Sequence, residues 1–291
     1  MASLDDLRKR IVSVKSTQKI TKAMKMVAAA KLRKAQESAE RGRPYSEKMQ
    51  NIILNLTESI SDPANAPKLL VGNGKEQVHL CVVMTSDKGL CGGFNSNICR
   101  LAKNYFLKVL KEGKTLKIIT IGSKGHDQLK REYGKFIIQK LSFKDRKKIS
   151  FNEADEVGKI ILDLFEKSEF DKCVLFYNNF KNVITQIPQA QQIIPAEHKE
   201  DPKKKNEIFY EFEPDEDEIL EDLLPKNIST QVFKAFLENS ASEQGSRMTA
   251  MDNATRNAGD LVKSLTIVYN RSRQAAITKE LIEIISGAES L

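Results

Sequence analysis

The chain has 291 residues, of which 40% are hydrophobic and 30% are charged, and its formal net charge is +8. A chain of this length can bury a sizeable core without covalent staples, so small disulfide-stabilised folds are excluded. No apolar run approaches the roughly 18 residues that a membrane-spanning helix needs. We therefore expect a chain that does not cross a bilayer.

The cysteines and the N-terminal residues bear on the cellular compartment. The four cysteines, Cys81, Cys91, Cys99 and Cys173, form no C-x-x-C pair, which argues against a zinc site or a redox dithiol. The first residues lack the basic stretch followed by an apolar one that marks a secretory signal. We expect a reducing compartment and neither a secretory nor a transit peptide.

Long helices are predicted at both ends because all eight prolines lie from Pro44 to Pro225. In the first proline-free stretch, apolar residues fill eight of eleven positions with the 3-4 spacing of a coiled coil. These positions are Leu4, Leu7, Ile11, Val14, Gln18, Thr21, Lys25, Ala28, Leu32, Ala35 and Ala39. The stripe is therefore a coiled-coil seam with a polar middle.

The C-terminal stretch repeats the pattern. Its predicted seam is Met251, Ala254, Ala258, Leu261, Leu265, Val268, Ser272 and Ala275. Neither helix can bury its stripe alone, so we expect the two ends to pair as one long antiparallel coiled-coil hairpin. The N-terminal arm is assigned to residues 1–60 and the C-terminal arm to residues 207–291. Ordinary helix packing in a bundle is the alternative.

The middle of the chain has a different period. Short apolar runs that are typical of strands occur at 78–84, 116–121, 136–138, 173–177 and 183–187. Helical segments are expected between several of them, near 95–111, 126–132 and 153–167. This alternation predicts a Rossmann-like α/β domain with a mainly parallel sheet over residues 75–206.

The most enzyme-like stretch is glycine-rich and runs from Thr85 to Asn95. A glycine-rich turn between a strand and a helix can present N–H groups to a phosphate. The stretch matches neither G-x-G-x-x-G nor G-x-x-x-x-G-K-[ST], so we favour a tight turn that allows close helix–sheet packing. Cys91 is interpreted as a small turn residue, and a nucleotide-dependent enzyme centred on Gly89 to Gly93 is the alternative.

No other cluster predicts chemistry. The three histidines, His79, His126 and His198, lack metal-ligand spacing, and His79 lies within an apolar strand. Acidic pairs such as Asp215 and Glu218 are typical of solvated faces or protein docking surfaces. We expect no catalytic residue, no cofactor and no metal.

Charge is sorted along the chain. Residues 1–43 carry twelve Lys and Arg against four Asp and Glu, whereas residues 207–222 carry nine acids and no base. A basic helix can follow a nucleic-acid backbone, but aromatic residues for base stacking are absent before Tyr45. We favour a solvated face with some cations meeting acidic partner proteins, and keep a coiled-coil nucleic-acid-binding protein as the alternative.

Four motifs together carry a resemblance to a known family. They are the C-terminal pattern at residues 277–290, the N-terminal stretches 17–24 and 26–29, the turn at 88–93 and the stretch 121–125. With the two arms they resemble the gamma subunit of the F-type ATP synthases, the central rotor shaft. The resemblance covers nearly the whole chain and is weakest between about Lys140 and Lys172.

The resemblance implies a non-catalytic shaft that rotates inside a ring of three alpha and three beta subunits and couples proton flow through the c-ring to ATP synthesis. It implies contacts with the alpha and beta subunits at Met24, Arg273, Gln274, Glu280 and Glu283. It also implies contacts with the epsilon subunit and the c-ring at Tyr210, Glu211, Glu213 and Asp215. ATP chemistry would belong to the beta subunits.

The resemblance also bears on the source and the location. Chloroplast members carry an inserted segment with a close cysteine pair, and this chain has no such pair. Without a presequence, a bacterial protein is favoured and a processed mitochondrial chain is the alternative. We expect a peripheral location on the cytoplasmic side of a bacterial inner membrane.

Overall fold

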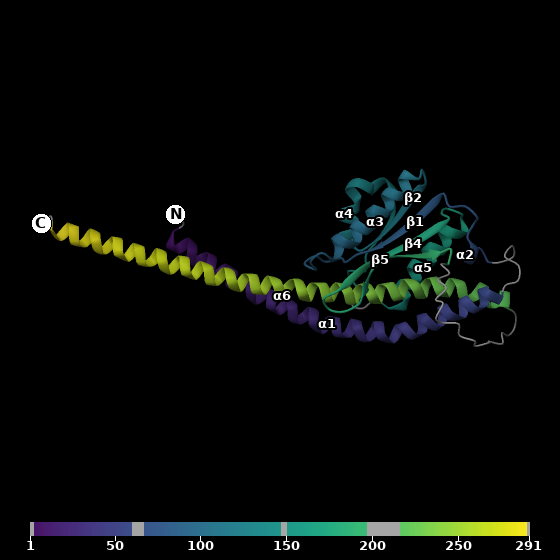
Figure 1. Ribbon diagram of the computed structural model, residues 1–291, viewed down its shortest axis with the longest axis horizontal. Coiled ribbons are helices and arrows are strands. Elements are labelled where there is room, and N and C mark those ends of the chain that lie inside the picture. The colour runs from purple at the N-terminus through teal and green to yellow at the C-terminus, as the bar shows by residue number, and fades with distance from the viewer. Residues whose placement is uncertain (1–2, 60–66, 147–149, 197–215, 290–291) are drawn as a thin grey trace. The chain divides into compact units, whose positions relative to one another are not determined.

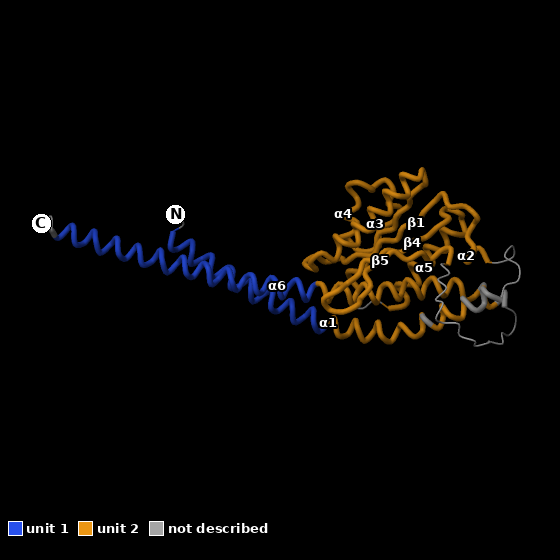
Figure 2. The backbone as a smooth tube through the Cα atoms, in the orientation of Figure 1, with its two compact units in different colours: residues 1–30, 247–291 blue, residues 31–246 orange. Residues whose placement is uncertain are grey.

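The computed structural model describes residues 3–59, 67–146, 150–196 and 216–289 (Figure 1). In chain order the elements are α1 (Leu4–Ser59), α2 (Lys68–Val71), β1 (Val78–Met84), α3 (Phe94–Lys111), β2 (Thr115–Ile121), α4 (Ser123–Tyr133), a 3-10 turn η1 (Gly134–Phe136), β3 (Ile137–Leu141), α5 (Phe151–Glu166), β4 (Lys172–Phe180), β5 (Gln186–Ile194) and α6 (Glu216–Glu289). The chain forms two compact units (Figure 2). Unit 1 comprises residues 1–30 and 247–291, and unit 2 comprises residues 31–246.

Unit 2 contains a five-stranded sheet with the order β3-β2-β1-β4-β5. The first four strands are parallel, and β5 runs antiparallel to β4. This confirms the Rossmann-like α/β prediction, and the three helices expected between strands are α3, α4 and α5. The last strand begins at Gln186 rather than residue 183, because the Asn182 side chain accepts hydrogen bonds from the amides of Ile184 and Thr185 and forms a turn there.

Two apolar clusters bury the faces of the sheet. On one face, Cys81, Ile118 and Phe176 pack against α3 and α4. On the other face, Leu80 and Leu175 pack against α5 and against α6 residues 228–236. The sheet is therefore a central layer, and α6 covers one of its faces as well as pairing with α1 (Figure 1).

Both long helices continue through a proline, which differs from the proline-free stretches expected from the sequence. α1 contains Pro44 and α6 contains Pro225. An internal proline costs roughly 3 kcal/mol, but apolar residues beside both prolines share a third buried cluster. Its members are Met49, Ile53, Leu70, Leu220 and Leu224. Burial of these side chains offsets the missing hydrogen bonds, and the short α2, which the sequence did not predict, supplies Leu70.

Among the helices of the described residues, none combines the length and the apolarity that a membrane crossing requires.

Candidate subunit interface on the helix pair

The seam of α1 follows the predicted positions. All eleven predicted residues are buried or half-buried, and Leu7, Ala28, Leu32 and Ala39 are fully buried. In unit 1, contacts pair rising numbers in α1 with falling numbers in α6, because Gln18 reaches Thr255 and Lys25 reaches Asp252. In unit 2, Arg43 contacts Glu238, and further along α1 Met49 and Ile53 share a buried cluster with Leu220 and Leu224 of α6. The predicted antiparallel pairing is therefore confirmed within each unit.

The seam of α6 differs from the prediction at alternate positions. Met251, Ala258 and Leu265 are buried as expected, but Leu261 is 43% exposed and Val268 is 45% exposed. Ala254 and Ser272 are half-buried as expected, and Thr255, Val262, Tyr269 and Ala276, each one position after a predicted seam residue, are half-buried as well. The 3-4 repeat can be placed on this sequence in two ways, or phases, which have every second seam position in common and differ by one residue at the others. The packing favours the phase with the more polar residues. Two large apolar side chains are thereby left outside the helix pair.

The middle of the helix pair in unit 1 is held by polar contacts. Lys25 Nζ lies 2.5 Å from Asp252 Oδ1, and the hydroxyl oxygens of Thr21 and Thr255 are 2.8 Å apart. The Gln18 amide donates to the Thr255 carbonyl over 3.4 Å. Because such contacts are directional, they fix which residues of the two helices lie opposite each other.

The charge at this level is shared by three side chains. Asp252 accepts from Lys25 on α1 and from Arg256 one turn later on its own helix, at 2.9 Å. The hydrogen bond from Lys25, and then the charge of Arg256, lower the pKa of the Asp252 carboxyl below its usual value. We therefore interpret Asp252 as a charged residue that fixes which residues of α1 and α6 lie opposite each other, rather than as a proton donor.

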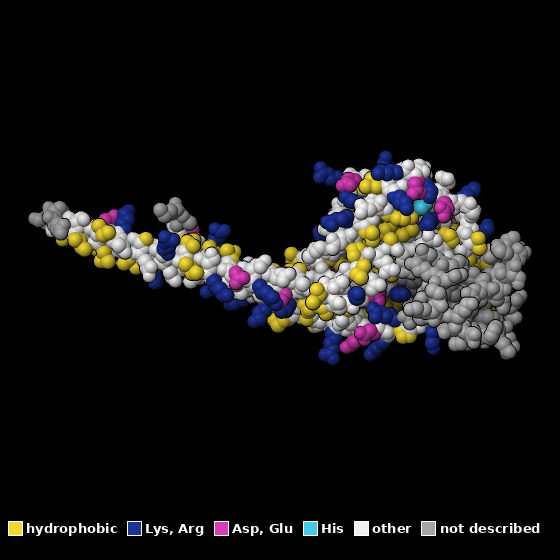
Figure 3. All heavy atoms as spheres, in the orientation of Figure 1, with side chains coloured by type: hydrophobic (Ala, Val, Ile, Leu, Met, Phe, Trp, Pro, Cys, Tyr) yellow, Lys and Arg dark blue, Asp and Glu magenta, His cyan; other side chains and the backbone are white. Residues whose placement is uncertain are grey.

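Large apolar side chains are exposed along unit 1. Among the described residues, twelve of the twenty exposed large apolar side chains belong to unit 1, which is about a quarter of the chain. On α1 they are Val12, Ile20, Met26 and Val27. On α6 they are Leu261, Ile267, Val268, Ile277, Leu281, Ile282, Ile284 and Ile285. Figure 3 shows apolar side chains interspersed with cations along these helices. We call these twelve residues the apolar belt.

The end of α6 has no helix beside it in the described structure. Ser272 and Ala276 are its last half-buried residues, and every residue from Ile277 to Ala288 is exposed. Its apolar residues Ile277, Leu281 and Ile285 recur every four residues and form one stripe. An apolar helical stripe in water is typical of a surface that another protein covers.

The residues expected to contact alpha and beta subunits all belong to unit 1. Met24 is half-buried on α1, whereas Arg273, Gln274, Glu280 and Glu283 are exposed on α6. The Gln274 carbonyl accepts a hydrogen bond from Thr278, and Glu283 lies 3.6 Å from Lys279. The four α6 residues therefore lie on one exposed segment of the helix. Tyr210, Glu211, Glu213 and Asp215 lie outside the described residues.

The glycine-rich turn between β1 and α3 is held by its own side chains. Asn95 accepts from the Ser86 amide at 3.0 Å and donates to the Ser86 hydroxyl at 2.8 Å. From α6, Ser246 donates to the Cys91 carbonyl at 2.6 Å. Gly92 adopts a φ of +58°, which favours glycine. These contacts give the turn a structural role beneath α6.

The N-terminus of α4 carries an internal anion. Asp87 Oδ1 accepts from the Ser123 amide and hydroxyl, both at 2.9 Å, and from the Ser142 hydroxyl at 2.8 Å. A helix N-terminus favours negative charge and can bind phosphate. Here the carboxylate of the chain itself takes that place.

The histidines do not converge on a metal site in the described part of the chain. His79 is buried with Nδ1 2.9 Å from the Tyr105 hydroxyl, and burial lowers the pKa of its ring. His126 Nδ1 lies 3.4 Å from the Thr120 hydroxyl. His198 lies outside the described residues. No group of three or more His, Cys, Asp or Glu could hold a metal ion among the residues that are described.

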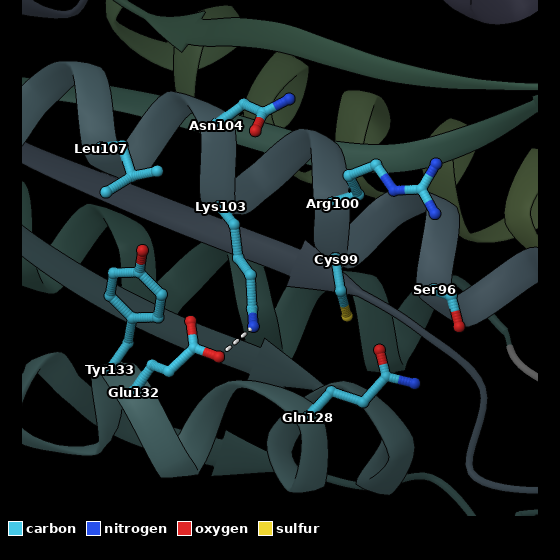
Figure 4. A pocket seen from close by; sticks show the side chains of 9 residues that line it. All are labelled: Ser96, Cys99, Arg100, Lys103, Asn104, Leu107, Gln128, Glu132 and Tyr133. Carbon is cyan, nitrogen blue, oxygen red and sulfur yellow. Dashed lines mark hydrogen bonds and ion pairs between the residues drawn. The ribbon is translucent and has the colours of Figure 1, made fainter.

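A shallow hollow of about 340 Å³ lies between α3 and α4 (Figure 4). Its lining includes Arg100 and Leu107 on α3 and Gln128 on α4. An ion pair of 2.8 Å between Lys103 and Glu132 crosses it. Burial raises the pKa of the Cys99 thiol in its lining to about 11, which disfavours the reactive thiolate at neutral pH. The hollow shows no catalytic arrangement.

Comparison with known proteins identifies relatives that match this chain over its whole length. The family model described as ATP synthase matches residues 3–291. A protein of Pelagibacter ubique named ATP synthase gamma chain is 73% identical over 291 residues, and the alignment covers all of both chains. The chain belongs to the ATP synthase gamma chain family.

Solved structures from mitochondrial ATP synthases share the fold. A chain of the central stalk and c-ring of the Tetrahymena thermophila mitochondrial ATP synthase is 28% identical, with a TM-score of 0.61 over 81% of this chain and 99% of that chain. A chain of the Euglena gracilis mitochondrial ATP synthase is 19% identical, with a TM-score of 0.68 over 99% of this chain and 94% of that chain. The family model and the relative of 73% identity confirm the family resemblance carried by the sequence motifs.

The sequence did not identify the apolar belt as a surface. Residues such as Ile20, Met26 and Ile267 lie between the seam positions of their helices and are exposed. The signal that could have found them is an apolar residue at a non-seam position of a coiled coil, where charged residues are the rule.

Proposed function

We propose that this chain is the central rotor shaft of an F-type ATP synthase and couples proton flow through the c-ring to ATP synthesis or hydrolysis in an alpha3beta3 ring. The observation that carries the proposal is the apolar belt of unit 1, on a chain of the ATP synthase gamma chain family. Twelve large apolar side chains around two helices need a cover, and a ring with an apolar lining provides one.

The proposed role is non-catalytic. In an open α/β sheet, ligands bind beyond the carboxyl ends of the strands, where the strand order reverses. In this chain that region lies between β1 and β4, and Ser246 of α6 hydrogen-bonds to the turn after β1. The Asp87 carboxylate takes the anion position at α4. These contacts support a sheet that serves as a mechanical body, with ATP chemistry assigned to the beta subunits.

Particular contacts follow from the proposal. Arg273 and Gln274 would form a hydrogen-bonded contact with a beta-subunit loop, since both are exposed on α6 and a guanidinium offers several donors in a fixed fork. Met24, Glu280 and Glu283 would lie beside the alpha and beta subunits. Such contacts must form in some rotary positions and break in others, so each must be weak.

The base of the shaft completes the proposal. Tyr210, Glu211, Glu213 and Asp215 would meet the epsilon subunit and the polar loops of the c-ring. The complex would hold this chain peripherally on the cytoplasmic side of a bacterial inner membrane. We also propose the division into a coiled-coil arm at 1–60, an α/β domain at 75–206 and a coiled-coil arm at 207–291.

The test is purification of the tagged chain from gently solubilised membranes of its host. We expect alpha, beta and epsilon subunits and the c-ring to co-purify with ATPase activity. Recovery of a monomer bound to nucleic acid, without ATPase activity, would contradict the proposal and favour the nucleic-acid alternative.

A second experiment addresses the contact residues. Arg273→Ala with Gln274→Ala should lower ATP synthesis by the purified complex while the helical content of the chain is unchanged, because both side chains are exposed on α6. Equal proportional losses of synthesis and helicity would contradict the contact role. Thr266→Ala, also on α6, is a control for substitution in this helix.

A further inference from the structure

Strand β4 extends beyond its parallel neighbour. The pairing of β1 with β4 runs from His79 with Lys172 to Val83 with Phe176, whereas β4 continues to Phe180. On its other side β4 keeps its partner, because Phe180 pairs with Gln186 of β5. The end of β4 therefore turns main-chain groups toward a side where no strand is paired with it.

Side chains of the long helices take the place of the missing strand. The Asn178 amide donates to Asn239 at 3.2 Å, and the Asn178 carbonyl accepts from Ser242 at 2.9 Å. Two residues further along the strand, the Phe180 amide donates to Glu238 at 3.1 Å, and the Phe180 carbonyl accepts from Arg43 at 3.4 Å. The main-chain groups of alternate residues point to the same edge of a strand. The four side chains therefore supply hydrogen-bond partners for the amides and carbonyls of Asn178 and Phe180 along this edge.

A buried charge lies at the centre of this arrangement. The Glu238 side chain is 3% exposed, and its second oxygen accepts from Arg43 Nε at 2.9 Å. One carboxylate therefore joins α6, α1 and β4. A buried carboxylate is costly without its partners, so separation of any of the three elements is opposed.

The polar contacts and the apolar packing of α6 on the sheet act differently. Ile228, Val232 and Phe236 pack on the sheet through apolar contacts, whose attraction has no preferred direction. Hydrogen bonds weaken steeply when donor and acceptor move out of line. The polar set therefore resists rotation and sliding of α6 and α1 against the sheet.

We propose that Arg43, Glu238, Asn239 and Ser242 form a torque clamp that locks the α/β domain to the two long helices. This inference rests on the proposed rotor function and names the residues that carry force within it. They are positioning residues, because they act on the main chain of β4 and not on a reacting group.

The test uses the complete complex reconstituted in vesicles, with ATP hydrolysis and ATP-driven proton pumping measured on the same preparation. The variants are Glu238→Gln, Asn239→Leu and Ser242→Ala. The matched control is Glu37→Gln, which removes the exposed α1 pair of Glu37 with Arg33. We expect the number of protons pumped per ATP hydrolysed to fall in Glu238→Gln, because an amide cannot accept both the hydrogen bond from the Phe180 amide and the one from Arg43. The control should keep the wild-type ratio.

The possible outcomes distinguish a torque clamp from residues that serve folding alone. The clamp is supported if an assembled variant such as Asn239→Leu has a lower pumping ratio and Asn239→Asp keeps the wild-type ratio. Asn239→Asp retains an acceptor oxygen for the Asn178 amide. An unchanged ratio overturns it, whether hydrolysis is normal or falls together with pumping. Failure of all three variants to assemble also overturns it, since the residues would then serve folding alone. Failure of the rotor function itself would be seen separately, as absent pumping in the wild-type vesicles.

Discussion

The two units bury their side chains to different degrees. In unit 2, residues such as Leu80, Ile118 and Phe176 are completely buried in the two faces of one sheet. In unit 1, only a few seam residues such as Leu7 and Leu265 are fully buried, and Ile267 and Ile284 are more than half exposed. Unit 2 has the core of a self-sufficient domain, whereas the helix pair of unit 1 leaves apolar surface for another protein. Stability and recognition are thus divided between the two units.

The largest effect is expected at Gly122 in unit 2. Its φ is +96°, and a Cβ there would lie 2.3 Å from the Thr85 carbonyl oxygen. Gly122→Ala should therefore lower the free energy of unfolding by about 3 kcal/mol, as backbone strain and overpacking add. Urea denaturation followed by circular dichroism measures this loss. Gly89→Ala is the control, since a Cβ at Gly89 meets nothing within 4 Å and should have little effect.

An intermediate effect separates the two phases of the α6 seam. Leu265 is 8% exposed and Leu261 is 43% exposed. Leu265→Ala should cost about 2 kcal/mol, near the lower end for core leucines because two helices bury less than a full core. Leu261→Ala should cost clearly less in the same thermal unfolding experiment. Equal losses would contradict the observed phase and restore the one predicted from the sequence.

A smaller effect is expected from the Asp252 charge. Its pKa in the folded chain is lowered, mainly by the hydrogen bond from Lys25. The charged carboxylate therefore stabilises the fold at pH values above the pKa of aspartate in the unfolded chain. This stabilisation is lost as the pH falls through the pKa of Asp252 in the folded chain. The helix pair should therefore weaken on acidification below about pH 4. Asp252→Asn should reduce this dependence in thermal unfolding measured across pH. Asp260→Asn serves as control, because Asp260 and its partner Lys263 are both highly exposed. If Asp252→Asn leaves the pH dependence of thermal unfolding unaltered, the stabilising role assigned to charged Asp252 is wrong.

The smallest effect on folding is expected at the end of α6. Leu281→Ser with Ile285→Ser should leave the melting temperature of the free chain almost unchanged, because both side chains are already exposed. Recovery of alpha and beta subunits with the tagged variant should nevertheless fall. Undiminished recovery would show that the belt at this end is not covered by those subunits. Ser286→Ala, at an exposed position of the same helix, is the control for substitution near the C-terminus.

Much of the fold could be predicted because periodicity reports burial directly. All eleven seam residues of α1 were identified, because eight of these positions are apolar and all are buried or half-buried in the helix pair. The strands were found for a similar reason, because a buried parallel strand is a short apolar run. The candidate contact residues on α6 came from the family resemblance, and the spacing alone would not have identified them.

Other features could not be predicted because they depend on contacts between distant segments. The α6 seam had two possible phases, and Thr255 was selected by its contact with Thr21 of α1. A proline disfavours the interior of a helix, but packing of Met49 and Leu224 near Pro44 and Pro225 outweighs that local rule. The torque clamp joins residues 43, 178 and 238, and no local pattern connects them.

The sequence by itself determined the two helical arms, the α/β order of the middle and the family. Each depends on residues that are close in the chain, where spacing and motif are sufficient. Only the tertiary structure decided which α6 residues enter the seam, which apolar residues stay exposed and how β4 is joined to α6 and α1. These features depend on which surfaces remain after both partners have packed, because hydrogen bonds and burial are shared between segments far apart in the chain.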